Sequence, residues 1–376
     1  MIPVNEPRIA KNALKYVSNC IKTGWVSSSG SYLKEFEEKF AARFGVKHAI
    51  TTSNGTASLH LSIAALNIGK GMEVILPAHT MMSSAAAIVY TGATPVLVDV
   101  ERDSWNMDVS QIEKKITKKT KAIMPVHIYG LPVDMDPVIK LAKQYDLAIV
   151  EDAAESTGAT YKNKLTGTLG DFGCFSFYAN KIITTGEGGM VLTNSDKLAA
   201  HARLLKDMAH SPKQRFLHEE IGFNYRMTNM QAALGLAQLE ELDLYLETKI
   251  WMAKMYNKLL SGLEGITLPI EKSWAKNVYW MYGILIEDSF GISRSKFMQE
   301  LLDRGVDSRT FFVPMNSQPA LLKMGLYSKE KYPVADEIGM KGLYIPSGLA
   351  ITKVQIEKVC EVIIEVHKKF HGKKHK

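Results

Sequence analysis

The chain has 376 residues, of which 46% are hydrophobic and 23% are charged. This composition is typical of a soluble globular protein and excludes a disordered chain, and the length allows two domains. The apolar runs are too short to span a bilayer, and the N-terminus does not have the pattern of a secretory signal. We therefore expect no membrane contact. Cys20, Cys174 and Cys360 are odd in number and widely spaced, so we also expect no disulfide, no metal site and a cytoplasmic location.

The net charge of +7 comes mostly from one end of the chain. The last ten residues, HKKFHGKKHK, contain five lysines, so the remaining residues carry a charge of +2. We interpret this tail as a solvated, frayed end, and the nearly neutral body gives no reason to expect a nucleic-acid partner. The alternative is a weak contact of the tail with a polyanion or a metal through His367, His371 and His375.

Strand and helix patterns alternate along the first part of the chain. Phenylalanines recur at helical spacing in residues 33–44. Short apolar runs predict strands at 48–52, 73–79, 94–100, 122–130 and 147–156, and helices are predicted between them at 58–66, 83–92 and 136–146. Strands that alternate with helices predict an α/β fold whose mostly parallel sheet is covered on both faces.

The pattern changes after Asn224. Residues 228–263 form a long helical pattern, and a strand at 279–287 and a helix at 293–305 follow it. We therefore predict a large domain that includes the N-terminal segment, residues 1–245, and a small C-terminal domain with the basic tail, residues 246–376.

Polar residues lie where predicted strands end, and ligands bind at those ends in open parallel sheets. Asp152 follows the apolar stretch LAIV, and SNGTA (53–57) lies between a strand and a helix. Gly55 lets the backbone approach a ligand, and the N–H groups of Thr56 and Ala57 at a helix N-terminus suit a phosphate. An ordinary helix cap is the alternative interpretation of this stretch.

Lys181 lies in FSFYANKIITTGEGGM (175–190) and has no charged neighbour before Glu187. Burial of a lysine is costly unless the amine is neutral, paired or covalently used, and burial makes the amine nucleophilic. A structural lysine whose end reaches solvent is the alternative. Ser176 offers a hydroxyl to a phosphate. A phosphate cradle, a buried lysine and a strand-end carboxylate such as Asp152 are the parts that pyridoxal phosphate requires.

Five ordered stretches resemble signature blocks of the DegT/StrS-type sugar aminotransferases: SNGTASLHL, EVILPAHT, VEDAAESTGA, FSFYANKIITTGEGGM and GFNYRMTNMQAALG. The resemblance covers nearly the whole chain. It implies an aspartate-aminotransferase-like fold of type I, with a mostly parallel seven-stranded sheet in the large domain and a smaller α+β C-terminal domain. It also implies a homodimer with shared active sites.

The resemblance further implies roles for single residues. Lys181 would form the Schiff base with pyridoxal phosphate, Asp152 would pair with the pyridinium nitrogen, and Glu155 would lie near the phenolic oxygen. Relatives with histidine in place of this lysine act as dehydratases, so the lysine favours amino transfer. The residues that would hold the phosphate are Thr56, Ala57, Ser176 and Asn224 of the partner subunit.

Two positions depart from the family pattern. Many members have an aromatic ring where this chain has Met81, whose thioether would cover the pyridine ring instead. In the loop 308–316, Asn316 replaces a histidine on the substrate side and Thr310 replaces a proline. Arg309 in this loop is a candidate ligand for a substrate phosphate, with an ordinary surface arginine as the alternative.

Together, the residues and the resemblance predict transfer of an amino group from an amino acid, with L-glutamate expected, to a nucleotide-linked 4-keto-6-deoxy sugar. Such a reaction would serve the synthesis of precursors for surface polysaccharides or other glycans. One alternative is an aminotransferase that acts on a smaller phosphorylated keto compound. The others are a pyridoxal-phosphate-dependent sugar dehydratase and a non-catalytic regulator with the same fold.

Overall fold

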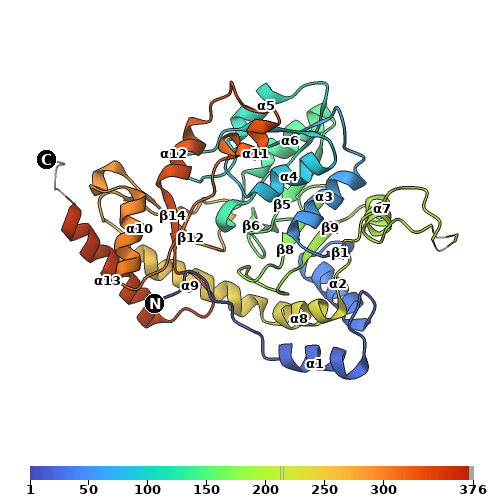
Figure 1. The fold of residues 1–376 in the computed structure, drawn as a ribbon, viewed down its shortest axis with the longest axis horizontal. Coiled ribbons are helices and arrows are strands. Elements are labelled where there is room, and N and C mark those ends of the chain that lie inside the picture. The colour runs from blue at the N-terminus through green and yellow to red at the C-terminus, as the bar shows by residue number, and fades with distance from the viewer. Residues whose placement is uncertain (212, 215, 372–376) are drawn as a thin grey trace.

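The computed structural model describes residues 1–211, 213, 214 and 216–371. A seven-stranded sheet lies at the centre of the large domain (Figure 1), in the order β1-β9-β8-β5-β4-β2-β3. Its strands are β1 (His48–Thr52), β2 (Glu73–Pro77), β3 (Thr94–Val98), β4 (Thr120–Ile123), β5 (Ala148–Asp152), β8 (Phe172–Ser176) and β9 (Gly189–Thr193). Only β9 runs antiparallel to its neighbours in this sheet, so the prediction of a mostly parallel seven-stranded sheet is confirmed.

Helices cover this sheet because their apolar faces match it. In α2 (Ser31–Phe44), Phe36 and Phe40 are fully buried, and the ring of Phe40 lies 5.3 Å from that of Phe175 in β8. Phenylalanines four residues apart share one helix face, which explains this packing. The other helices of the large domain are α3 (Gly55–Ala65), α4 (Met82–Tyr90), α5 (Ile112–Lys115), α6 (Met135–Tyr145), α7 (Asp196–Lys206) and α8 (Asn229–Glu240).

Several predicted strands end earlier than expected, since β2 ends at Pro77, β3 at Val98 and β5 at Asp152, and the largest difference is at residues 122–130. Residues 122–130 were expected to be extended, but β4 ends at Ile123. Pro125 has no N–H to donate to a neighbouring strand, and Tyr129 adopts a positive φ of 52°. Regular strand pairing therefore stops after Ile123, although Val126 still forms an isolated parallel bridge with Asp152 at the end of β5, and the chain turns at Ile128–Gly130.

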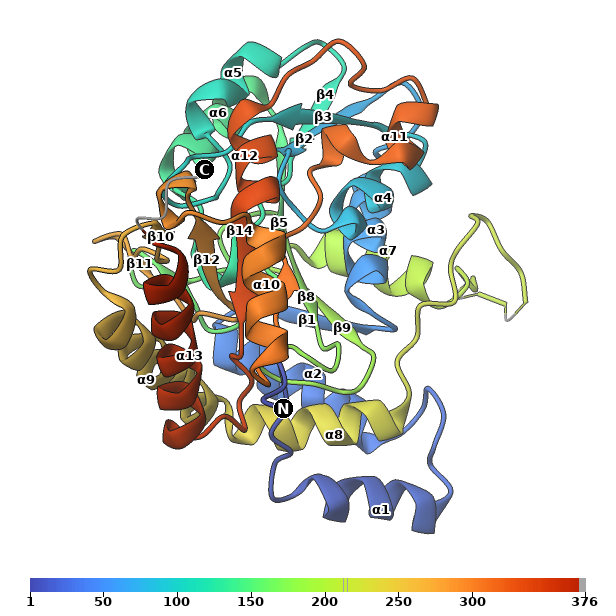
Figure 2. The same cartoon turned by 60° about the vertical axis from the view of Figure 1, so that its left-hand side comes forward.

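The small domain has its own sheet and core. Its sheet contains β10 (Ile266–Thr267), β12 (Tyr282–Ile286), β14 (Gly342–Ile345) and β13 (Arg309–Thr310), and its longest helices are α9 (Leu242–Leu260), α10 (Arg294–Asp303) and α13 (Lys353–Phe370). Figure 2 shows α10 and α13 on the outer side of β14. The predicted boundary at residue 245 falls inside α9, which is continuous, and the exact division stays a prediction.

Further elements complete the fold. They are α1 (Ala13–Thr23), α11 (Pro319–Lys323), α12 (Pro333–Lys341) and a small sheet of β11 (Ala275–Lys276), β6 (Thr160–Tyr161) and β7 (Lys164–Leu165). The N-terminus begins on the small domain, where Ile2 pairs with Val306, and α1 then lies along α8 (Figures 1 and 2).

The basic tail is described only in part. The rings of His367 and His371 stack with their centroids 4.4 Å apart at the end of α13, whereas residues 372–376, including His375, lie outside the described residues. Within the described part of the chain, no cluster of three or more His, Cys, Asp or Glu side chains could hold a metal ion. In that same part, no helix is long and apolar enough to cross a membrane.

Candidate active site

A cavity of roughly 740 Å³ opens at the carboxyl ends of the parallel strands, between the two domains. Strand ends and the helices that follow them supply most of its wall. The small domain and the segment leading into it add three aromatic side chains: Trp280, Phe312 and Tyr344. The residues predicted from the sequence that line the cavity are Thr56, Ala57, Met81, Asp152, Glu155, Ser176 and Lys181.

Asp152 is the last residue of β5, and both oxygens of its carboxylate accept hydrogen bonds. Ser84 donates its hydroxyl to Oδ2 at 2.8 Å, and the backbone N–H of Ala154 donates to Oδ1 at 3.2 Å. Burial raises the pKa of Asp152 above its ordinary value, which the two hydrogen bonds partly offset. A fixed, buried carboxylate is suited to pair with a ring N–H.

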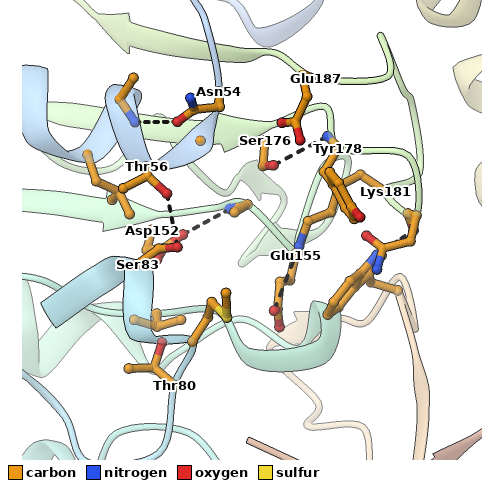
Figure 3. Close-up of a pocket in the computed structure, with 18 of the residues that line it drawn as sticks. Asn54, Thr56, Thr80, Ser83, Asp152, Glu155, Ser176, Tyr178, Lys181 and Glu187 are labelled. Atoms are coloured by element: carbon orange, nitrogen blue, oxygen red, sulfur yellow. Dashed lines mark hydrogen bonds and ion pairs between the residues drawn. The ribbon is translucent and has the colours of Figure 1, made fainter. Parts of the chain in front are cut away.

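Lys181 and Glu155 form a buried pair on the opposite side of the cavity from the end of α3. The Lys181 Nζ lies 3.8 Å from Oε1 of Glu155, and the Lys181 side chain is only 11% exposed (Figure 3). Burial lowers the pKa of Lys181 and raises the pKa of Glu155, so both groups are shifted toward their neutral forms. The other oxygen of Glu155 accepts a hydrogen bond from the N–H of Tyr129 at 2.8 Å.

The N-terminus of α3 faces the cavity, but one of its predicted donors already has a partner. The Ala57 N–H donates to Oδ1 of Asn54 at 2.8 Å, so Asn54 forms an ordinary N-terminal cap of α3. In the described residues, the N–H groups of Gly55 and Thr56 have no partner within the chain. A Cβ on Gly55 would lie 2.7 Å from Cβ of Ser176, so glycine is what brings the Ser176 hydroxyl to this helix end.

These features fit pyridoxal phosphate. A carboxylate, an amine of lowered pKa and two unpaired N–H groups at a helix N-terminus line one cavity, and the Ser176 hydroxyl lies beside that helix end. Met81, which was expected over the ring, lies at the N-terminus of α4 with 48% of its surface exposed and lines the same cavity.

Three predicted residues do not line this cavity. Asn224 is exposed and accepts a hydrogen bond from Arg226 at 3.0 Å. Arg309, whose side chain is 60% exposed, pairs with Asp307, and Asn316 donates to Asp336 at 2.9 Å. Their suggested roles therefore stay predictions.

Several residues of the site were not predicted from the sequence. Trp280 lies with the centre of its ring 3.6 Å from the Lys181 Nζ, and Ser84 orients Asp152. Tyr129 holds Glu155 through its backbone, in a conformation with φ of 52°. Trp280 is 99 residues from Lys181 in the sequence, and no local pattern connects them. Ser84 could have been identified from the sequence, since it follows a strand end and lies at the start of a predicted helix.

The sequence profile of the DegT/DnrJ/EryC1/StrS aminotransferase family matches residues 7–364. Among curated proteins, the chain is 43% identical to the GDP-perosamine synthase of Caulobacter vibrioides over 97% of this chain and 98% of the relative. It is 42% identical to the GDP-perosamine synthase of Escherichia coli O157:H7, over 97% and 98% of the two chains.

Solved structures agree with this assignment. DesV of S. venezuelae superimposes with a TM-score of 0.88 at 33% identity, over 96% of this chain and 99% of that one. The pyridoxal-phosphate form of the putative sugar aminotransferase Spr1654 from Streptococcus pneumoniae gives a TM-score of 0.91 at 26% identity, over 98% and 99%. The predicted type I fold is confirmed by these neighbours. The chain therefore belongs to the DegT/DnrJ/EryC1/StrS aminotransferase family and is an aminotransferase that uses pyridoxal phosphate.

Proposed function

We propose that this enzyme transfers an amino group from an amino acid, L-glutamate, to the keto group of a nucleotide-linked 4-keto-6-deoxy sugar. The observation that carries the proposal is the single cavity that Lys181, Glu155 and Asp152 line together with the N-terminus of α3. Similarity to two GDP-perosamine synthases over nearly the full chain supports a sugar nucleotide as the acceptor. The product would be an amino sugar for surface polysaccharide or another glycan, made in the cytoplasm.

Each residue of the site has a distinct role in this proposal. Pyridoxal phosphate, when bound, supplies the electron sink for the pair of electrons released at the carbon that carries the amino group. Lys181 holds the cofactor through its amine and, when the amine is free, moves a proton at the donor Cα. Asp152 keeps a proton on the ring nitrogen, and the backbone donors at Gly55 and Thr56 bind the phosphate together with Ser176.

The buried position of Lys181 suits its amine for proton transfer. Burial lowers the pKa of the amine, so a larger share of it is neutral and able to accept a proton near neutral pH than an exposed lysine would offer. Glu155 limits this shift because its carboxylate favours the ammonium form. The pair therefore lets the amine alternate between donor and acceptor of a proton.

The acceptor can be identified by a direct assay. The pyridoxamine-phosphate form of the purified enzyme is mixed with a panel that contains GDP-, UDP- and dTDP-linked 4-keto-6-deoxy sugars and smaller phosphorylated ketones. We expect one of the sugar nucleotides to restore the absorbance of the pyridoxal form, with Lys181→Ala protein as the blank. Restoration by a small phosphorylated ketone alone would favour the alternative acceptor, and release of a dehydrated sugar without amine transfer would favour a dehydratase.

We also propose that two chains form a homodimer with shared sites. The described residues between α7 and α8 that extend away from the body of the large domain (Figures 1 and 2) include exposed Leu217 and Ile221 as well as Asn224. Exposed apolar side chains on a projecting segment are suited to contact with another chain. Asn224 is exposed and outside its own chain's cavity, which is what the proposed contact with the partner's phosphate requires.

Mixing of two inactive variants tests this arrangement. We expect Lys181→Ala and Asn224→Ala homodimers to be inactive and an equal mixture to recover about a quarter of wild-type activity. Half of the dimers would be mixed, and one of the two sites in each would be intact. The measurement is turnover after subunit exchange, with exchange verified by mass spectrometry. Exchange without recovery of activity would mean that Asn224 does not act across the dimer.

A further inference from the structure

Trp280 presents the face of its indole ring to the amine of Lys181. The Lys181 Nζ lies 3.6 Å from the ring centre, about as close as its distance of 3.8 Å to Glu155 Oε1. Trp280 is 4% exposed, so little water competes for this contact. An ammonium over an indole face is stabilised electrostatically, and the effect is strongest where water is excluded.

Two hydrogen bonds fix the position of Trp280. Its Nε1–H donates to the backbone oxygen of Asn180, the residue before Lys181, at 2.8 Å. Its own backbone oxygen accepts a hydrogen bond from Nζ of Lys249 at 2.9 Å. The indole is thus tied to the segment that carries the amine that it contacts.

Lys249 is a second buried lysine that the proposed reaction does not use. It lies in α9 with 2% exposure, and its other acceptor is the backbone oxygen of Ser347. Burial lowers the pKa of Lys249 to about 7. Burial of a lysine that binds two backbone oxygens and no carboxylate costs free energy of folding. We therefore interpret Lys249 as a residue that positions the backbone it binds and not as one that stabilises the fold.

The backbone next to Trp280 is strained. Tyr279 has a φ of 48°, a conformation that is unfavourable for a residue with a side chain. The segment also passes very close to Gly130, where a Cβ would lie 2.9 Å from the nitrogens of both Tyr279 and Trp280. Strain of this kind persists only where the surrounding structure enforces it, and it concentrates at functional sites.

We propose that Trp280 is a positioning residue that holds the amine of Lys181 whenever this amine is not bonded to the cofactor, and that Lys249 acts through Trp280. The proposal rests on the role of Lys181 in the proposed function. During each catalytic cycle the amine is released and must later return to the same carbon. The indole face and Glu155 are the two groups that keep it within reach between these events.

The proposal predicts how the free amine titrates. The ionisable groups that face it are the carboxylates of Glu155 and Asp152, while Lys249 contacts the backbone of Trp280. Because an aromatic face favours the ammonium form, its removal lowers the pKa of the amine further. A leucine at position 280 fills part of the space without a ring face, and a phenylalanine keeps a ring face.

The test uses the pyridoxamine-phosphate form of the full-length enzyme, in which the Lys181 amine is free. Acetylation of Lys181 by acetic anhydride is followed by mass spectrometry from roughly pH 6 to 10, relative to exposed Lys34. The midpoint reports the pKa of the amine, and the plateau at high pH reports its accessibility. We expect the midpoint to fall by about one pH unit in Trp280→Leu, and by much less in Trp280→Phe.

Steady-state kinetics supply the second readout. Trp280→Leu is expected to lower kcat by about tenfold and to leave KM for the amino donor within about twofold, because the ring holds the amine and not the substrate. Trp280→Phe should recover most of kcat. Trp274→Leu is the matched control, since Trp274 lies on the same segment, packs against Tyr161 and does not line the cavity. It should leave both readouts unchanged.

Lys249→Met tests the second part of the proposal. If Lys249 acts through Trp280, the double variant Trp280→Leu/Lys249→Met loses no more kcat than Trp280→Leu alone, whereas independent effects would multiply. Should Lys249→Met not fold, the comparison of leucine with phenylalanine at position 280 still decides the main point.

The outcomes separate this inference from the proposed function. An unchanged midpoint and kcat in Trp280→Leu, or a phenylalanine variant no better than the leucine variant, would overturn the role of Trp280 while borohydride still attached the cofactor to Lys181. Attachment of the cofactor to a different lysine would overturn the proposed function, and this inference with it.

Discussion

Replacement of Lys181 by alanine is expected to lower turnover by about 10⁴-fold and to abolish covalent retention of the cofactor. The amine has two tasks in the proposed reaction, attachment of the cofactor and proton transfer, and a well-placed general acid–base group alone contributes up to about 10⁴-fold. In the described residues no other lysine lines the main cavity, so no nearby amine can take over these tasks.

The measurement combines kinetics with peptide mapping. Borohydride reduction of the pyridoxal form should fix a pyridoxyl group on the peptide that contains Lys181, and the label should be absent from Lys181→Ala. Lys34→Ala is a suitable control because the Lys34 side chain is 80% exposed and its pair with Glu38 lies on the surface. Lys249 is the most informative alternative site, since its amine is also buried and has a pKa of about 7. A label on Lys249 would contradict the assignment.

Asp152→Asn is expected to bind pyridoxal phosphate but to lose on the order of 10²-fold or more of kcat. The amide has nearly the shape of the carboxylate, and it can still accept a hydrogen bond from Ser84 or Ala154 through its oxygen. It carries no negative charge, however, and cannot hold a proton on the ring nitrogen, so the ring becomes a weaker electron sink. Because the site is buried, water does not compensate for the lost charge.

Two readouts separate catalysis from folding in this variant. Cofactor affinity should change little, whereas kcat should fall with every acceptor tested. Asp136→Asn is the matched control, since it makes the same chemical change at an exposed ion pair with Lys162. Near-normal turnover of Asp152→Asn would show that another acid pairs with the ring nitrogen. Ser84→Ala should show a smaller loss of kcat, because it removes the hydrogen bonds of Ser84 to Asp152 and Thr80 but leaves the charge of Asp152 in place.

Patterns in the amino-acid sequence predicted five of the seven strands of the large sheet and polar residues at strand ends. Apolar runs separated by helical patterns predict a parallel sheet, and the geometry of such a sheet brings the carboxyl ends of its strands to one edge. Asp152, Ser176 and the start of α3 were therefore predictable as neighbours, although they lie far apart in the chain. Lys181 could be singled out because burial of a lysine in an apolar stretch costs free energy unless its amine is neutral, paired or covalently used.

The contacts around these side chains could not be predicted from the sequence, because they depend on the tertiary structure. Trp280 reaches Lys181 because Gly130 admits the segment 278–280 and Lys249 binds its backbone, and these contacts join residues that lie far apart in the sequence. No periodicity or local motif encodes such contacts, since they depend on how the small domain packs against the large one. The same holds for the outward position of Asn224 and for the hydrogen bond of Asn316 to Asp336. Sequence patterns report local geometry and burial, whereas the partner of a buried polar or aromatic group is set by long-range packing.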